Sequence, residues 1–236
     1  MKKKIIFTGG SGRFAKVFRK LNYKENIFFP TSKQLNIESL KSIKKYLNKI
    51  NPTHLIHAAA LSRPMQIHEK KILKSINTNI IGTANIVKAC YEKKIKLIYF
   101  STNHVYPGIK GNYKETDPVL PINKYGISKF GGECCVQMYQ NSLILRICMT
   151  ENPFIHEQAF KDVDSNFMFH DEFAKNLLKL IDQKGIINVG GPTQSIFSFA
   201  RKNNKEIKNI SAKKIYGDKY PLKQSMNINL YKKSIR

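Results

Sequence analysis

Tyr125 and Lys129 have the residue types and the spacing of a proton-transfer pair. They stand four apart in the segment Tyr125-Gly126-Ile127-Ser128-Lys129, which opens a helical stretch, so on a helix they share one face. An ammonium about 4 Å from a phenol, at an effective dielectric of about 20, is worth roughly 4 kcal/mol, or about 3 pKa units. Such a shift would bring the tyrosine pKa close to neutrality, where a general acid or base works best.

A third candidate group, Thr102, stands where a buried strand is expected to end. The short apolar run Leu97-Ile98-Tyr99-Phe100 is rich in strand formers and is too short for a helix. It stops at Ser101-Thr102, and a loop punctuated by Pro and Gly then leads to Tyr125. We therefore expect Thr102, Tyr125 and Lys129 to be the catalytic residues, with the threonine hydroxyl sharing a substrate oxygen with the phenol.

The start of the chain has the strand, glycine loop and helix pattern that is typical of a dinucleotide-binding unit. A buried strand, Lys4 to Phe7, leads into Thr8-Gly9-Gly10-Ser11-Gly12-Arg13-Phe14-Ala15 and then into a helix that is expected to run to about Leu21. The glycines allow a tight turn and a close approach to a pyrophosphate, which would rest on the helix N-terminus. The cofactor contacts expected in this loop are Gly9, Ser11, Gly12, Arg13 and Phe14.

The segment after the second strand, Asn26 to Phe29, indicates which cofactor is bound. NAD-binding chains place an acidic residue here for the ribose 2′-hydroxyl, and this chain has none. Thr31, Ser32 and Lys33 offer donors and positive charge instead, which suits a 2′-phosphate, and Arg13 can assist. The sequence therefore favours NADP(H) over NAD(H), although Lys33 also fits the description of a solvated loop lysine.

Several motifs together carry a family resemblance. Thr102, Tyr125 and Lys129 resemble the Thr/Ser-Tyr-Lys set of the extended short-chain dehydrogenase/reductase superfamily. The surrounding residues are similar to the dTDP-4-dehydrorhamnose reductases and their sugar-nucleotide-binding relatives: they comprise Ser101-Thr102-Asn103-His104-Val105-Tyr106-Pro107-Gly108, Glu115-Thr116-Asp117, Pro121 and Gly132-Glu133.

The resemblance implies further contacts. Asn36 would lie under the adenine ring, and Asn79, in an Asn-x-x-Gly-Thr-x-Asn signature, would support the active-site water or Lys129. His57 replaces the usual asparagine and is interpreted as a packed core residue. The small residues Ala58, Ala59 and Ala60, at a strand's carboxyl end, let a flat cofactor pack closely. The expected substrate contacts are Arg63, Asn103, His104 and Lys223.

Alternating strands and helices predict an α/β fold, a Rossmann-type doubly wound parallel sheet. Residues 1–150, completed by 184–210, should form the dinucleotide-binding domain. Residues 151–183 and 211–236 should form a small substrate-binding lobe, which is shorter than that of the family. Helices are expected over 38–49, 69–92, 130–139 and 171–181.

Composition excludes several classes of protein. The net charge of +25 over 236 residues comes from lysines scattered along the chain without a recognised nucleic-acid motif, so we expect no nucleic-acid partner. No apolar run reaches membrane-spanning length and no signal peptide is recognised, so a cytoplasmic protein without a membrane partner is expected. Cys90, Cys134, Cys135 and Cys148 lack metal-ligand spacing and are expected to be buried thiols, and no metal site is predicted.

The favoured function is an NADPH-dependent reduction of a 4-keto nucleotide sugar. Dehydratases of this superfamily carry an Asp-Glu pair after the catalytic threonine, and this chain has Asn103-His104 instead. A nucleotide-sugar epimerase remains an alternative. So does a non-catalytic NADP-binding regulatory subunit, because the regulatory subunit of methionine adenosyltransferase resembles these reductases. A homodimer that completes the short substrate lobe is also expected.

Overall fold

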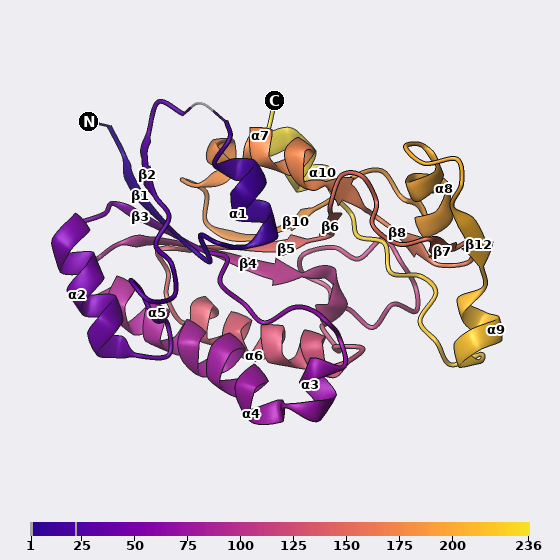
Figure 1. Ribbon diagram of the computed structural model, residues 1–236, viewed down its shortest axis with the longest axis horizontal. Helices are drawn as coiled ribbons and strands as arrows, with labels where there is room; N and C mark the ends of the chain where they lie inside the picture. Colours follow the sequence, from indigo (N-terminus) through magenta and orange to yellow (C-terminus); the bar gives the residue numbers. More distant parts are fainter. Residues whose placement is uncertain (1, 22) are drawn as a thin grey trace.

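The computed structural model describes residues 2–21 and 23–236 and is built on a six-stranded sheet (Figure 1). All of its strands are parallel, in the order β10-β5-β4-β3-β1-β2. They are β1 (Lys4–Thr8), β2 (Asn26–Phe28), β3 (His54–His57), β4 (Lys96–Thr102), β5 (Ser142–Ile147) and β10 (Gly185–Val189). The order reverses between β1 and β3, and such a switch point is where doubly wound sheets bind ligands. The predicted Rossmann-type sheet is confirmed.

The central strands are apolar throughout because helices cover both faces of the sheet. In β1, Ile5 and Phe7 pack into one apolar layer and Ile6 packs into the other. The first layer is closed by α1 (Arg13–Phe18), α7 (His170–Leu180) and α10 (Asn229–Ser234). The second is closed by α2 (Leu40–Ile50), α5 (Gly82–Glu92) and α6 (Lys124–Gln137), as Figure 1 shows.

Most element boundaries follow local signals, with one exception. Helix α2 begins where the Ser39 side chain accepts from the Ser42 N–H, and it ends at Asn51, which is left-handed (φ 49°) before Pro52. The continuous helix predicted over 69–92 is wrong. Lys71 leaves helical geometry (φ −132°, ψ 61°), and the segment divides into α3 (Ile67–Lys70), α4 (Ile72–Ser75), a π-helix (Ile76–Ile81) and α5.

A small lobe lies beyond the carboxyl edge of the sheet (Figure 1). Its elements are β7 (Gln158–Phe160) paired with β12 (Lys208–Ile210), α8 (Ile196–Arg201) and α9 (Ala212–Tyr216). Phe154, Ala159 and Phe199 belong to its separate apolar cluster. Two short strand pairs adjoin it: β6 (Met149–Thr150) with β9 (Met168–Phe169), and β8 (Asp164–Ser165) with β11 (Gln194–Ser195).

The packing distributes the C-terminal half differently from the expected domain boundaries. Helix α7 packs against α1, and α10 packs against β10, so both belong to the main layers of the fold. Residues 194–210, which were expected to complete the dinucleotide-binding domain, pack instead with the small lobe, whose apolar cluster includes Phe199 and Ile207. Long-range packing explains this difference, because Phe173 and Leu177 of α7 and Tyr231 of α10 pack into the main apolar layer against the sheet.

The described residues contain free cysteines but neither a membrane-spanning helix nor a metal-ligand cluster. All four cysteines are free, and Cys90 and Cys148 are buried as predicted. Cys134 is exposed and Cys135 is only partly buried, because neither lies on the buried face of α6. Across residues 2–21 and 23–236, no helix combines the length and apolarity needed to cross a membrane. The same residues contain no group of three His, Cys, Asp or Glu side chains placed to hold a metal ion.

Candidate active site

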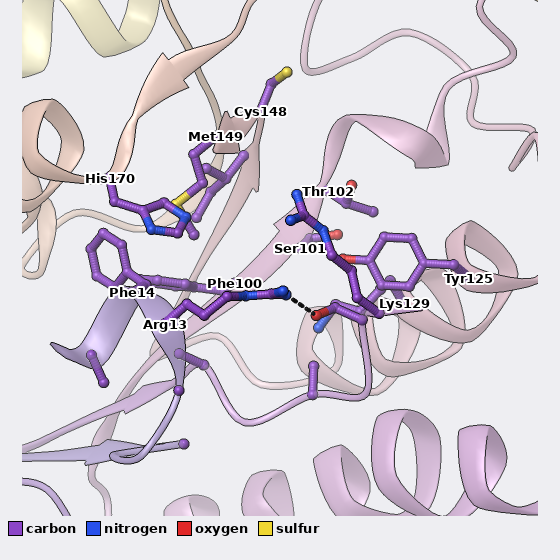
Figure 2. Close-up of a pocket in the computed structure, with 18 of the residues that line it drawn as sticks. Arg13, Phe14, Phe100, Ser101, Thr102, Tyr125, Lys129, Cys148, Met149 and His170 are labelled. Carbon is purple, nitrogen blue, oxygen red and sulfur yellow. Dashed lines mark hydrogen bonds between the residues drawn. The ribbon is translucent and has the colours of Figure 1, made fainter. Parts of the chain in front are cut away.

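A cavity of about 520 Å³ lies at the switch point of the sheet. Its walls come from the loop after β1, the residues after β3, the end of β4, the first two turns of α6 and the β6 segment. Figure 2 shows Tyr125, Lys129 and Thr102 on one side and Phe14, Met149 and His170 on the other. Most of the residues expected to do chemistry therefore meet in one place.

The glycine loop fits closely against the neighbouring strand ends. Gly9 adopts φ +74°, and a Cβ there would lie 2.9 Å from the Ala59 backbone nitrogen, so only glycine is accommodated. The Gly12 N–H donates to the Gly9 carbonyl at 2.8 Å, which closes the turn. Ala58 and Ala60 add small side chains to the adjoining wall. The loop thus has the shape of a cradle for a phosphate-bearing cofactor.

Helix α6 is held so that its first turns face this cavity. The Asn123 side chain caps it by accepting from the Gly126 N–H at 2.8 Å. A Cβ at Gly126 would lie 2.5 Å from the His104 carbonyl oxygen, so glycine permits the close approach of the helix to the turn that follows β4. Farther along, the buried Glu133 accepts from Ser101 Oγ at 2.7 Å and from Arg146 Nε at 3.1 Å, which ties α6 to β4 and β5.

Tyr125 lies in the wall of the cavity and keeps its phenolic proton. Two histidine rings flank its ring, with centroids 5.2 Å away for His68 and 5.9 Å away for His104. Burial raises the Tyr125 pKa above its usual value, although contact with the Thr102 side chain and the positive charges of Arg63 and Arg13 oppose that rise. The phenol therefore carries its proton at neutral pH.

Lys129 does not act on Tyr125 as expected. Its side chain is buried, and its Nζ lies over the Tyr99 ring, 4.1 Å from the centroid, so it turns toward the core of the helix layer. Burial lowers the Lys129 pKa to about 7, while the charge of Glu133 partly opposes this effect. The Tyr125 pKa is raised and not lowered, so the expectation that the ammonium depresses it is wrong in this structure. An amine that is itself half neutral supplies little field.

Thirteen of the twenty predicted site residues line the cavity. Those lining it are Gly9, Ser11, Gly12, Arg13, Phe14, Ala58, Ala60, Arg63, Thr102, Asn103, His104, Tyr125 and Lys129. Those outside it are Thr31, Ser32, Lys33, Asn36, Ala59, Asn79 and Lys223. Thr31, Ser32 and Lys33 are exposed beyond the end of β2 and do not line the cavity.

Two of these outlying residues, Asn79 and Lys223, have structural partners, and so does the core residue His57. Asn79 is buried, accepts from the Leu61 N–H at 2.8 Å and donates to Ser128 Oγ at 2.8 Å, so it joins the loop after β3 to α6. Lys223 pairs with Asp164 at 2.6 Å in the lobe. His57, interpreted as a core residue, is buried between the hydroxyls of Thr8 (2.8 Å) and Thr83 (3.1 Å), and burial lowers its pKa to about 3.

Glu151 and His170 line the cavity but were not found from the sequence. Glu151 lies just after β6, in the segment whose family likeness is weakest, and His170 is the first residue of α7. Neither belongs to a motif with a recognisable spacing. The only available signal was the position of Glu151 directly after a short buried strand, near where other strands place polar residues.

The fold and these side chains define an α/β protein with a Rossmann-type parallel sheet and a cavity at the glycine loop. A family model, that of the RmlD substrate binding domain, matches residues 2–165, and the chain belongs to this family. The dTDP-4-dehydrorhamnose reductase of Aggregatibacter actinomycetemcomitans is 27% identical over 202 residues, covering 81% of this chain and 63% of that protein. The beta subunit of methionine adenosyltransferase 2 from Xenopus laevis is 27% identical over 156 residues, covering 61% and 46%. This chain therefore spans less than two thirds of each of these relatives.

Solved structures agree on the fold. A Bacillus anthracis dTDP-4-dehydrorhamnose reductase in complex with NADP superposes with a TM-score of 0.85 at 24% identity, covering 98% of this chain and 92% of that one. A hypothetical dTDP-4-dehydrorhamnose reductase from Sulfolobus tokodaii gives 0.83 at 25% identity, with coverage of 98% and 94%. The likeness extends over the small lobe as well as the sheet.

Proposed function

We propose that this chain is an NADPH-dependent reductase of a 4-keto nucleotide sugar that acts in deoxysugar or polysaccharide biosynthesis. The observation that carries the proposal is that Thr102, Tyr125 and Lys129 line the same cavity as the glycine loop. The similarity to dTDP-4-dehydrorhamnose reductases supports the substrate class, and the NADP complex of the Bacillus anthracis protein supports the cofactor.

The residues present fit a dinucleotide. The glycine turn, which leaves no room for a side chain at Gly9, and the small Ala58 and Ala60 form a surface on which a flat cofactor can lie. When bound, the cofactor supplies a hydride to the substrate carbonyl. Thr102 would hold the substrate carbonyl oxygen, and Tyr125 would give its proton to that oxygen as it gains negative charge. Lys129 would bind the nicotinamide ribose.

The protonation state of Tyr125 favours reduction. A phenol whose pKa is raised by burial remains protonated at neutral pH, and a reductase needs a proton donor at the oxygen that receives negative charge. Asn103 and His104 stand where a dehydratase would need two carboxyl groups, and burial lowers the His104 pKa to about 4, so this imidazole is neutral. Asn103 and His104 therefore provide no carboxyl pair for the elimination of water.

A non-catalytic, NADP-binding role is the second candidate, favoured by the likeness to the methionine adenosyltransferase beta subunit. Incubation with NADPH and a panel of 4-keto nucleotide sugars separates the two. A reductase oxidises NADPH only when the matching sugar is present, whereas a regulatory subunit binds NADPH and oxidises none with any sugar. An epimerase would convert a nucleotide sugar without net consumption of NADPH. The cytoplasmic location and the homodimer remain predictions from the sequence.

A further inference from the structure

Two arginines and one glutamate form an ionic bridge across the cavity. Arg13 Nε lies 3.0 Å from Glu151 Oε1, and Arg63 Nη1 lies 3.0 Å from both Glu151 carboxylate oxygens. The Arg13 guanidinium also donates to Ser62 Oγ at 3.3 Å, a contact drawn in Figure 2. The three charged residues come from three separate elements: the start of α1, the loop after β3 and the segment after β6.

The bridge shares the cavity wall with Tyr125. Figure 2 shows Arg13 extending from the start of α1 toward Tyr125. Both guanidinium groups lie close enough to the Tyr125 phenol for their positive charges to oppose the rise of its pKa. A diphosphate ligand whose reacting end approaches Tyr125 therefore comes within reach of Arg13 and Arg63.

The charges of the bridge do not cancel. Two guanidinium groups carry two positive charges, whereas Glu151 carries one negative charge. Burial alone would raise the Glu151 pKa, but a hydrogen bond from its own backbone and the charges of Arg63 and Arg13 lower it, so the carboxylate is ionised at neutral pH. The Glu151 side chain is 17% exposed, against 47% for Arg13 and 33% for Arg63. Guanidinium groups bind carboxylate and phosphate oxygens through the same planar donors, so a phosphate can take the place of this carboxylate.

We propose that Arg13 and Arg63 form a subsite for a diphosphate group and that Glu151 occupies it until the ligand displaces its carboxylate. Glu151 then sets the affinity: it orders the two arginines in the free protein and competes with the anion that they are placed to bind. The diphosphate can belong to the nucleotide sugar or to the dinucleotide cofactor. This inference rests on the proposed function only for the identity of the ligand, not for the competition.

Glu151→Gln tests the competition, because it keeps the size of the side chain and removes its charge. The probes are dTDP, with and without saturating NADP⁺, and NADP⁺ alone, each titrated calorimetrically. We expect the variant to bind the displacing ligand about tenfold more tightly than the wild type, since the arginines lose their internal anion. A gain confined to dTDP assigns the subsite to the substrate, and a gain confined to NADP⁺ assigns it to the cofactor.

Three further variants control the result. Glu157→Gln removes an exposed carboxylate of the same lobe and should leave every affinity unchanged. Arg63→Gln should weaken binding, and Glu151→Gln combined with Arg63→Gln should lose most of the gain, because Glu151 acts through the arginines. Equal or weaker binding by the Glu151→Gln protein, with its fold intact by circular dichroism, would overturn the inference. Tighter binding without turnover of any keto sugar would instead count against the reductase alone.

Discussion

The Lys129 ammonium lies over the face of the Tyr99 ring, with Nζ 4.1 Å from the ring centroid. The Tyr99 hydroxyl in turn donates to the Lys129 carbonyl at 3.0 Å, so the ring is fixed against the same turn of α6. A cation over an aromatic face is stabilised electrostatically, by up to about 2 kcal/mol when water is excluded. This contact offsets part of the cost of burying the ammonium, but not all of it, since the Lys129 pKa still falls to about 7.

Lys129→Met should therefore flatten the pH dependence of stability. Between pH 7 and 9 the native wild type has largely released the Lys129 proton, whereas the unfolded chain keeps it, so the unfolding free energy rises with pH. The contribution over this interval is about 2 kcal/mol. Urea unfolding of both proteins at pH 7 and pH 9 measures it. A wild type and a variant with equal pH dependence would show that the native ammonium keeps an ordinary pKa.

Tyr125→Phe should abolish turnover and leave cofactor binding nearly intact. The substitution removes the proton donor but keeps the ring between His68 and His104. General acid catalysis typically contributes about 10² to 10⁴ in rate, so a loss of at least about a hundredfold in kcat is expected. Steady-state kinetics and a parallel NADPH titration provide the two readouts. Activity within about tenfold of the wild type would exclude Tyr125 as the acid.

The protein should bind NADPH more tightly than NADH. Ser32 and Lys33 are exposed just beyond β2, where a 2′-phosphate would lie, and no acidic residue stands beside them. The Thr31 N–H and hydroxyl both donate to Gln34 Oε1, so Lys33 is the main remaining contributor. Lys33→Glu should weaken NADPH binding about tenfold and leave NADH binding nearly unchanged.

Fluorescence titration with each cofactor measures this preference. Lys49→Glu makes the same change of charge at the far end of α2 and serves as the control. Equal affinities of the wild type for the two cofactors would mean that the loop after β2 faces away from the ribose.

The buried pair of Glu133 and Arg146 should be strongly coupled. Their side chains are 0% and 3% exposed, and Arg146 also donates to the Tyr106 hydroxyl at 2.7 Å. Glu133→Ala should lower the unfolding free energy by about 3–5 kcal/mol, because it leaves a buried guanidinium without its counter-ion. Adding Arg146→Met should restore part of that loss. A double-mutant cycle by urea unfolding measures the coupling, and simple additivity of the two losses would contradict it.

The elements of the site that depend on local sequence patterns could be predicted from the sequence. The side-chain contacts that depend on packing between distant segments could not. The glycine loop, the strand ending at Thr102 and the shared face of Tyr125 and Lys129 follow from spacing alone. The turn of the Lys129 amine onto Tyr99 does not, because it depends on how closely α6 approaches β4. Glu151 lacked a signal for the same reason: its partners lie 88 and more residues away along the chain.

The C-terminal tail leaves the small lobe with few donors for a substrate. Lys223, an expected substrate contact, and its two neighbours in the tail are already engaged within the chain. Lys223 pairs with Asp164 at 2.6 Å, Gln224 Nε2 donates to the Pro221 carbonyl at 2.9 Å, and Ser225 Oγ accepts from the Asn112 N–H at 2.9 Å. A nucleotide sugar needs several fixed donors at its base and its phosphates, and one copy of this lobe supplies few.

We therefore expect a homodimer in which the second copy completes the substrate site. Light scattering of the protein, alone and with a saturating nucleotide sugar, should give twice the mass of the chain at least in the bound state. Dilution below the dissociation constant of the dimer should weaken substrate binding while leaving NADPH binding unchanged, since the glycine loop and its neighbours lie within one chain. A strict monomer that binds the nucleotide sugar in the low micromolar range would show that the short lobe suffices by itself.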